Sequence, residues 1–385
     1  MRNENRFGSY EQDLPQIAVD SIQQLNAQEI SSATEPNKEP GPDDLSDPSM
    51  YPSAEAVCFL SIESRKLAAC FHSEIASIIS QSFFERMSCA LLDEQVPKHR
   101  HAEYIACVNF FILTVVVGLE ATDKNGHDVP RLRILQSRYR QNAFTALRYI
   151  SVLNSPSLSL LQALLAGAML YQMSGYQQKS AYLSALACVT CSQLGGHYFA
   201  ELAASASEQE SLEDRQCLGH CYIIDQSLAL SMGRRSFLSE MNVNASVLMP
   251  PERDMPIMPI FNIYLQFARI QDDIARHLRK GPALHGLDED VGQEAYINDL
   301  QSRMHEIRQK IRQFRSQPPH CDDSLLQGEW MCVDLTYFNI MTIILRLHPG
   351  FETSRQARAP CLESARRALH RLLDVERHGS YHPEI

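Results

Sequence analysis

The sequence predicts an all-α protein, and three observations support this fold class. From Ala54 onward, apolar residues recur every three to four positions almost throughout, which is the spacing of one face of an α-helix. Very few segments alternate apolar and polar residues as half-buried strands do. Hydrophobic residues make up 44% and charged residues 21% of the 385 residues, a balance typical of a globular chain that buries a core.

Residues 1–53 predict a disordered tail. The segment is polar and acidic, and it is punctuated by Pro15, Pro36, Pro40, Pro42, Pro48 and Pro52. Such a chain cannot bury enough apolar surface to offset the entropy lost on ordering. A short helix around Asp20 to Ile30 is the expected exception. The sparse apolar residues leave an activation-type segment open as an alternative to a solvated tail. The helical domain is expected to span residues 54–385.

The helical periodicity divides this domain into a series of helices. The predicted ranges are Ala54 to Cys70, Ser73 to Leu92, His101 to Leu119, Leu132 to Asn154, Leu158 to Ser174, Gln178 to Leu194, Leu212 to Gly233, Pro259 to Leu278, Gln293 to Ser316, Leu325 to His348 and Cys361 to Arg377. Prolines break the series between Asn242 and Pro259 and again between Gln317 and Gln327, because no helix interior tolerates them. Between Ala143 and Gly233 the helices follow one another in pairs, which predicts paired antiparallel helices.

Charge and cysteine usage exclude several classes of protein. The formal net charge is -11 and the pI about 5.7, so the summed field repels phosphate backbones and we expect no direct DNA binding by this chain alone. Eleven cysteines is an odd number and they are scattered through apolar runs, which predicts reduced, mostly buried thiols rather than a disulfide framework.

Targeting segments are not expected either. Met1 to Gln12 carries no apolar h-region, so it does not read as a signal peptide. The longest apolar stretch, Ile105 to Leu119, falls short of the roughly 20 residues that a spanning helix needs. We therefore predict a core helix there, a cytoplasmic or nuclear protein, and no membrane partner.

The most diagnostic stretch lies at residues 158–251. A helix LSLLQALLAGAMLYQMSG is followed by a second, AYLSALACVTCSQLGGH. An acidic spacer comes next, followed by RQCLGHCYIIDQSLALSMGRRSFLSEMNVNASVLMP. The spacer contains Glu208, Glu210, Glu213 and Asp214. The order and spacing of these segments carry more weight than any one of them.

This arrangement resembles the fungal-specific transcription factor domain, also called the middle homology region. The family shows a YLGxA, RMA and LGLH helix, an acidic turn, and a long helix that runs through DRxLS and LGRP into a tail ending in LP. The matching positions here are Tyr182, Leu183, Ala185, Leu186, Ala187, Leu194, Gly195, His197, Asp225, Ser227, Leu230, Gly233, Arg234, Asn242, Val243 and Pro250. Later segments, IYLQFARIQDDIARHL, CVDLTYFNIMTIILRLHP and CLESARRALHRLL, extend the resemblance across residues 54–373.

The sequence also departs from the family. Gln226 stands where the family has Arg, and Arg235 stands where it has Pro. The residues before Cys58 contain no cysteine, so the six-cysteine zinc cluster that normally reads DNA is missing from this sequence. The chain also stops before the final helices that such domains usually have.

The resemblance implies a nuclear transcription regulator, or a regulatory subunit, of a fungal pathway such as secondary metabolism. It would act through contacts with other transcription regulators or with a DNA-binding partner protein, and a small-molecule effector in the helical core is open. We expect no enzymatic activity, no cofactor and no metal. A scaffold unrelated to transcription is the plainer alternative.

Four residues of the family motif are candidate site residues: Asp225, Ser227, Gly233 and Arg234. In family members the Gly-Arg pair lies at a helix end. Glycine ends helices in left-handed geometry, and a following arginine can reach a buried carboxylate. We expect Asp225 and Arg234 to hold the helix end and the next loop together, with contact to a ligand as the alternative.

Two clusters suggest other chemistry. Cys188 and Cys191 form a CxxC, and Cys217, His220 and Cys221 lie at i, i+3 and i+4, so these residues could hold zinc. Both sets lie on apolar faces, where free cysteine packs as a small hydrophobe, and we predict core packing. A catalytic thiol is not expected, because these surroundings lack the positive charge that activates one.

The enzymatic alternative is a magnesium-dependent class I terpene cyclase, which is also all-α. Asp272 and Asp273 begin a DDxx pattern, and an NDxxSxxxE pattern places carboxylates on one helix face, where they could chelate Mg²⁺. The second pattern is formed by Asn298, Asp299, Ser302 and Glu306. Arg276 occupies the place of the third acid of the first pattern, and the cyclase fold separates the two by several helices. We predict solvated faces with helical salt bridges to Arg269, Arg276, Arg279, Arg303 and Arg308.

Overall fold

A computed structural model describes residues 45, 47–70, 78–122, 128–151, 154–195, 208–238, 258–280, 289–316 and 323–378. In this part of the chain the protein is entirely helical, with no strand and with eleven α-helices. They are α2 (Ala54–Cys70), α3 (Gln81–Leu92), α4 (His101–Thr122), α5 (Val129–Arg148), α6 (Leu158–Met173), α7 (Gln177–Gln193), α9 (Glu208–Met232), α11 (Met258–Lys280), α12 (Glu289–Arg315), α13 (Asp323–Arg346) and α14 (Arg355–His378). The predicted all-α class is confirmed.

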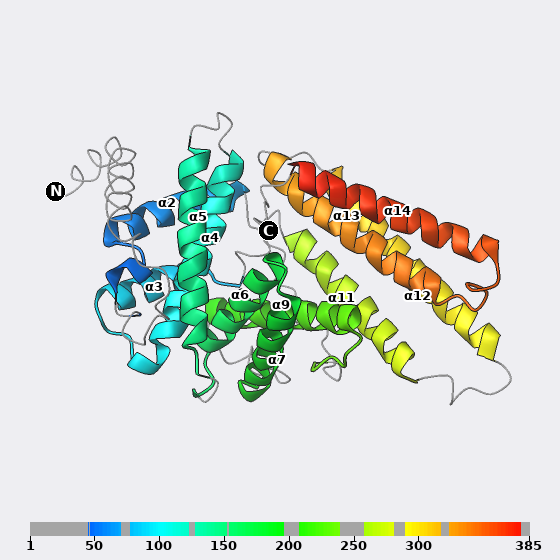
Figure 1. Ribbon diagram of the computed structural model, residues 1–385, viewed down its shortest axis with the longest axis horizontal. Coiled ribbons are helices and arrows are strands. Elements are labelled where there is room, and N and C mark those ends of the chain that lie inside the picture. Colours follow the sequence, from blue (N-terminus) through cyan, green and yellow to red (C-terminus); the bar gives the residue numbers. More distant parts are fainter. Residues whose placement is uncertain are drawn as a thin grey trace, which may run out of the picture.

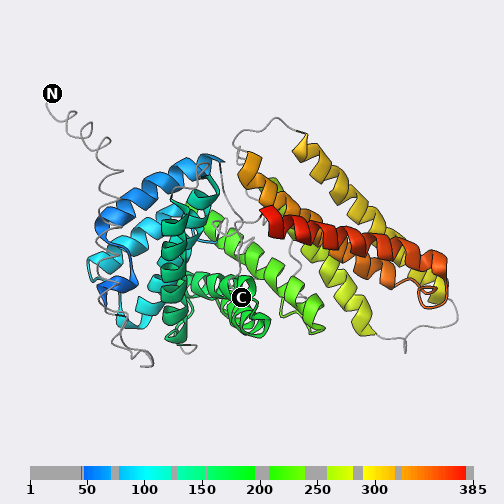
Figure 2. The same cartoon turned by 45° about the horizontal axis from the view of Figure 1, so that its top comes forward.

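Helices that follow one another along the chain form antiparallel pairs, as predicted. These pairs are α4 with α5, α6 with α7, and α13 with α14, and α9 also packs on α11. Figure 1 shows α2 to α9 gathered at one end of the molecule and α11 to α14 lying along one another at the other end, and Figure 2 shows the same division from a second direction. α11 lies between the two groups.

Several predicted helix bounds need correction. The helix predicted from Ser73 begins at Gln81, because the Ser80 side chain accepts a hydrogen bond from the amide of Phe83 and so caps it. The helix predicted over Leu132 to Asn154 is shifted, and α5 ends at Arg148. α14 starts before the predicted Cys361 and accommodates Pro360 near its beginning.

The acidic spacer is a further correction. Part of it was predicted to precede the helix, but α9 already begins at Glu208. Acidic residues are favourable there, because the amino-terminal end of a helix carries a partial positive charge. Both predicted irregular connections lie mainly outside the described residues, at 239–257 and 317–322.

The predicted tail is wrong for its last residues. Leu45 and Met50 are buried, and a short 3-10 helix, η2 (Pro48–Met50), is capped by the Asp47 side chain. The Asn109 amide group donates to the Met50 carbonyl at 2.7 Å. These contacts tie the segment onto α4, and they were not predicted because only two apolar residues make the anchor. Residues 1–44 lie outside the described part of the chain.

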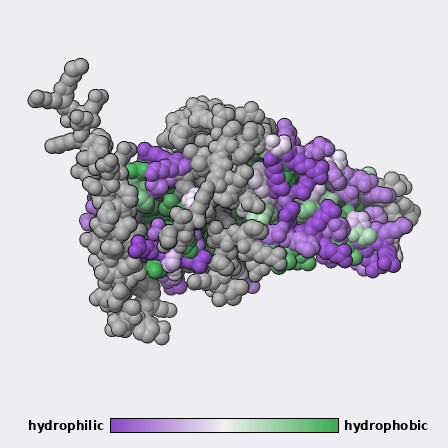
Figure 3. All heavy atoms as spheres, turned by 90° about the horizontal axis from the view of Figure 1, so that it is seen from above, coloured by the Kyte–Doolittle hydropathy of each residue, from purple (hydrophilic) through white to green (hydrophobic). Residues whose placement is uncertain are grey.

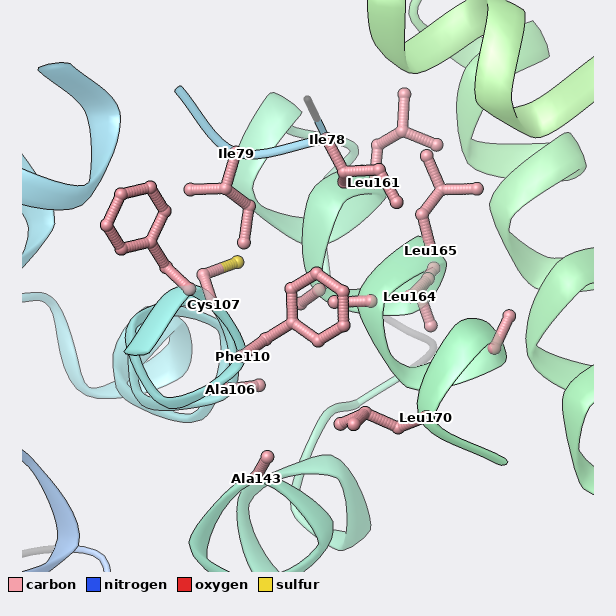
Figure 4. Packing of buried hydrophobic residues seen from close by; sticks show 14 of the residues in the cluster. Ile78, Ile79, Ala106, Cys107, Phe110, Ala143, Leu161, Leu164, Leu165 and Leu170 are labelled. Atoms are coloured by element: carbon pink, nitrogen blue, oxygen red, sulfur yellow. The ribbon is translucent and has the colours of Figure 1, made fainter. Parts of the chain in front are cut away.

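The larger hydrophobic core is built around α4 and α6. Both helices are apolar on nearly every side, which is the pattern of a helix surrounded by others. Figure 4 shows Phe110 of α4 packed toward Leu161, Leu164 and Leu165 of α6. The apolar stretch at residues 105–119 was expected to be too short to span a membrane, but it belongs to a helical segment, Lys98–Glu120, that is long and apolar enough to do so by length and composition alone. In the structure 83% of the apolar window of this segment is buried, as in the predicted core helix.

Buried polar groups fix how α4 and α6 meet. Glu103 of α4 is fully buried and accepts hydrogen bonds from three side chains at the start of α6: Asn154 at 3.2 Å, Ser157 at 3.2 Å and Ser159 at 2.6 Å. A buried carboxylate without such donors would cost several kcal/mol. The network therefore specifies one register between the two helices.

A second core lies among α11, α12, α13 and α14. α11 contributes to both cores from opposite faces: Phe261, Leu265 and Ala268 belong to the first, and Ile263, Phe267, Ile270 and Ile274 belong to the second. Gly219 of α9 permits this close approach, since a β-carbon there would lie 2.5 Å from the Phe261 ring.

Candidate functional site

The carboxyl-terminal end of α9 closes as the sequence predicted. Gly233 has a φ of +63°, in the left-handed region that favours glycine. The Arg234 amide donates to the Ala229 carbonyl at 3.0 Å, and the Gly233 amide donates to the Leu230 carbonyl at 3.4 Å. This pair of bonds is a Schellman motif, which satisfies helix carbonyls that would otherwise lack partners.

Asp225 anchors the segment that follows this helix end. Its carboxylate is fully buried and accepts four hydrogen bonds, so its charge is well compensated. The donors are Arg234 Nη1 at 2.9 Å, Ser236 Oγ at 2.6 Å, the Phe237 amide at 2.7 Å and the Leu238 amide at 3.0 Å. The predicted contact between Asp225 and Arg234 is present.

Arg234 does more than neutralise Asp225. Its Nη1 also donates to the Arg235 carbonyl at 2.8 Å, and its guanidinium lies 4.9 Å from the centre of the Phe237 ring. Its Nε and Nη2 are buried without an acceptor among the described residues.

Gln226, which stands where the resembled family has Arg, also contributes to this arrangement. Its amide nitrogen donates to the Ser236 hydroxyl at 2.8 Å, so it orients one of the donors to Asp225. The sequence marked Gln226 only as a departure from the family pattern, and it did not single out Ser236. Ser227, the remaining candidate, is half-buried on α9 and takes no visible part in this network.

The rest of the family motif is spread over α7 and its end. Leu183 is buried, whereas Tyr182 is 62% exposed. Gly195 follows α7 with a φ of +83°. His197, Asn242, Val243 and Pro250 lie outside the described residues, so the tail of the motif is not placed.

The cysteines of the two clusters pack in the core, as predicted, whereas Cys58 of α2 and Cys89 of α3 are exposed. Cys188 and Cys191 of α7 lie against Cys221 of α9, with Cys188 Sγ and Cys221 Sγ 3.6 Å apart. Hydrogen bonds to these two thiols, together with burial, hold the pKa of Cys221 well above its usual value. Cys217 points elsewhere, toward the Ile78 carbonyl at 3.5 Å. The described residues contain no group of three or more His, Cys, Asp or Glu arranged to hold a metal.

The acidic patterns of α11 and α12 are occupied by arginines. Arg276 pairs with Asp272 at 2.7 Å and with Asp273 at 3.0 Å, and Arg303 of α12 reaches Asp273 at 2.8 Å. Asn298, Asp299, Ser302 and Glu306 are exposed, as predicted. Asp272 is a correction, because it is buried and burial raises its pKa.

A larger ionic cluster was missed from the sequence. Asp334 of α13 is buried, and three arginines from two other helices converge on it. They are Arg308 and Arg315 of α12, the latter at 3.0 Å, and Arg371 of α14 at 3.5 Å. The four residues come from three helices, so no local spacing could have indicated the cluster.

Two surface features are candidates for binding. Leu362, Leu369, Leu372 and Leu373 on α14 are 63%, 61%, 49% and 44% exposed. A small open pocket lies where the end of α5 meets α6 and α7, and Tyr182 forms part of it. The first is an outward face of an edge helix (Figure 1), and the second is a hollow.

No family model, curated protein or solved structure matches this chain. The resemblance to the fungal-specific transcription factor domain therefore stays a prediction from the motif.

Proposed function

We propose that this protein is a nuclear transcription regulator of a fungal pathway that acts by docking a helix of a DNA-binding partner protein onto α14. The order of the motif segments supports the transcriptional part of the proposal. The observation that carries it is the row of exposed leucines on α14.

The leucines form one stripe. Leu362, Leu369 and Leu373 are separated by seven and four residues, spacings that place side chains on the same face of a helix. The opposite side of α14 packs on α13 through buried Cys361, Ser364 and Ala368. The stripe therefore faces away from the core. Figure 3 shows this end of the molecule as mainly hydrophilic with hydrophobic residues interspersed.

Charge on the same face indicates the chemistry of the partner. Arg358 and Arg366 flank the stripe, both are exposed, and within the described chain neither forms an ion pair. Leucines bordered by unpaired arginines complement an amphipathic helix whose apolar stripe is edged by Asp or Glu. A single exposed leucine needs no explanation, whereas a stripe of this kind marks an interaction surface.

The test is a tethering assay in a fungal cell. The chain is fused to a heterologous DNA-binding module, and output from the matching reporter is measured. We expect the wild-type fusion to change reporter output, and Leu369→Glu combined with Leu362→Glu to abolish the change, because a charge at the centre of a helix contact is left desolvated and unpaired.

Ile134→Glu is the matched control, since Ile134 is also an exposed apolar residue on a helix, at 46%. It is expected to retain full output. Thermal melts show whether each variant folds. Equal output from the wild type and both variants, or equal loss in both, would contradict the proposal.

A second measurement tests whether the chain binds DNA without its partner. In a gel-shift assay at physiological salt, we expect no sequence-specific shift by the purified chain, because its net charge is -11. Nanomolar binding to a specific fragment without a partner would show that the chain reads DNA itself.

A further inference from the structure

An open pocket of about 320 Å³ lies between the end of α5, α6 and the first turns of α7. Its apolar lining is formed by Leu147, Leu183 and the ring of Tyr171, and its rim carries Arg148, Lys179 and Tyr182. This volume is at the lower end of the range found for small-molecule sites. None of the three rim residues contributes to the two hydrophobic cores.

The inner side of the pocket is rigidly built. A β-carbon at Gly167 of α6 would lie 2.7 Å from both Leu147 and Leu183, so only glycine lets these helices approach so closely. Phe144 supports the Tyr171 ring at 4.7 Å between centroids. Tyr171 in turn meets the Tyr176 ring edge-on at 6.1 Å. The hollow is thus fixed by packing rather than left by loose side chains.

The rim is positively charged. Lys179 Nζ lies 5.2 Å from the Tyr171 ring centre and 4.9 Å from the Tyr176 ring centre, so the two rings hold its side chain in place. Arg148 is exposed at the end of α5. In the described chain neither cation has a carboxylate partner, although acidic residues outnumber basic ones by 46 to 35. Both cations are therefore available to an anionic group that enters the hollow.

Aromatic surface at the rim is also left uncovered. Tyr182 is 62% and Tyr176 is 55% exposed. Exposed tyrosine rings offer a flat apolar face with a polar tip, which suits stacking against another ring. A ligand that matches this pocket needs a flat body for the rings and a negative charge for the cations.

We propose that this pocket binds a small aromatic carboxylate, with its ring system against Tyr171 and Tyr182 and its carboxylate between Arg148 and Lys179. Charge-assisted hydrogen bonds from arginine and lysine to a carboxylate are the strong contacts in such a complex. The pocket thus indicates the chemical class of an effector. Only the step from ligand binding to regulation rests on the proposed function.

The experiment is isothermal titration calorimetry of the full chain with 2-naphthoate and with its uncharged analogue 2-naphthamide. We expect 2-naphthoate to bind at least tenfold more tightly. Arg148→Gln and Lys179→Gln should each weaken binding of 2-naphthoate about tenfold and bring it toward that of the amide. Tyr182→Ala should weaken both ligands. All three side chains are exposed, so the variants are expected to fold.

Arg358→Gln and Arg366→Gln are controls of matched charge on α14, and they should leave 2-naphthoate binding unchanged. Equal affinity for the acid and the amide, no heat with either ligand, or equal loss in pocket and control variants would overturn the proposal. In the reporter assay the pocket variants retain the α14 contact. Absence of 2-naphthoate binding to the wild type with normal reporter output would overturn this proposal alone, whereas 2-naphthoate binding without any reporter response to the α14 variants would overturn the proposed function alone.

Discussion

In the region from α2 to α9 the central helices are apolar on nearly every side, whereas in the region from α11 to α14 the helices α12 and α14 each have one apolar and one charged face. The first region buries most of α4 and α6 among their neighbours. The second region exposes charged faces of α12 and α14 and buries a smaller core, and Figure 3 shows this end of the molecule as mainly hydrophilic. Beyond hydrophobic packing, the two regions therefore depend on different polar interactions to fix how their helices meet.

Buried carboxylates show the difference most clearly. Glu103 takes its hydrogen bonds from neutral side chains, and three of the four donors to Asp225 are neutral. Asp334, in the second region, is surrounded by three arginines that are each partly exposed. Short-range hydrogen bonds are insensitive to salt, whereas partly exposed ion pairs are screened by it. Ionic strength is thus expected to distinguish the two regions.

The largest expected effect is at Asp225. Asp225→Ala removes the acceptor of four donors, two of them backbone amides, and should lower the free energy of unfolding by about 3 to 5 kcal/mol. Arg234→Ala should cost less, because three donors to the carboxylate remain. Urea denaturation monitored by circular dichroism measures both changes.

A double-mutant cycle controls for indirect effects at this position. Asp225→Asn combined with Arg234→Gln should recover part of the summed losses of the two single variants, as expected for residues in direct contact. Strictly additive losses would show that the pair contributes no coupling energy. An unchanged midpoint for Arg234→Ala would favour a ligand or partner contact as the role of that arginine.

Asp334 provides the counterpart in the second region. Asp334→Ala leaves three arginines without their shared carboxylate, but these side chains are 20%, 32% and 40% exposed and regain water, so we expect a loss of about 2 to 3 kcal/mol. The loss should shrink as sodium chloride is raised toward 1 M, while that of Asp225→Ala should stay constant. Equal salt dependence in both variants would remove the proposed contrast.

Glu329 on α13 is expected to make the stability of the second region depend on pH. Burial raises its pKa to about 7, so in the folded protein it keeps its proton over a range in which the unfolded chain has lost it. Its contribution to stability is complete below pH 4.5 and is lost as pH rises through about 7. We expect this contribution to be about 3 kcal/mol. Unfolding curves from pH 4.5 to 8 should show the decline, and Glu329→Gln should flatten it.

The smallest expected effect is at Gly233. Gly233→Ala introduces a β-carbon at a φ of +63°, where no other atom crowds it, so only the backbone conformation is penalised and the cost should be about 1 kcal/mol. Thermal denaturation measures it. Gly292→Ala on α12 is the control, since that position has open space and should gain stability slightly.

The sequence predicted what depends on local pattern. Periodicity and a glycine-terminated helix end each lie within one segment of the sequence. The helical class, the pairing of helices, the left-handed glycine at residue 233 and the contact between Asp225 and Arg234 were therefore all accessible. The Asp334 cluster and the Gln226 to Ser236 bond were not accessible. The first joins three helices, and the second depends on how the loop folds back.

The leucine stripe and the pocket also differ in how far a local sequence pattern indicates them. The stripe on α14 follows from helical spacing, but the periodicity of the sequence does not say which face is left uncovered. The pocket needs residues from α5, α6 and α7 at once, and its rim is recognisable only when the absence of ion pairs at Arg148 and Lys179 is seen among the described residues.

The position of α11 has a consequence for how the chain unfolds. Because α11 contributes apolar side chains to both cores, unfolding of either core exposes the helix that stabilises the other. The two halves should therefore lose structure in one cooperative transition rather than in two steps. A chain cut after α9 would leave the face around Gly219 bare where Phe261 now packs, so neither half should be expressed as a stable separate unit.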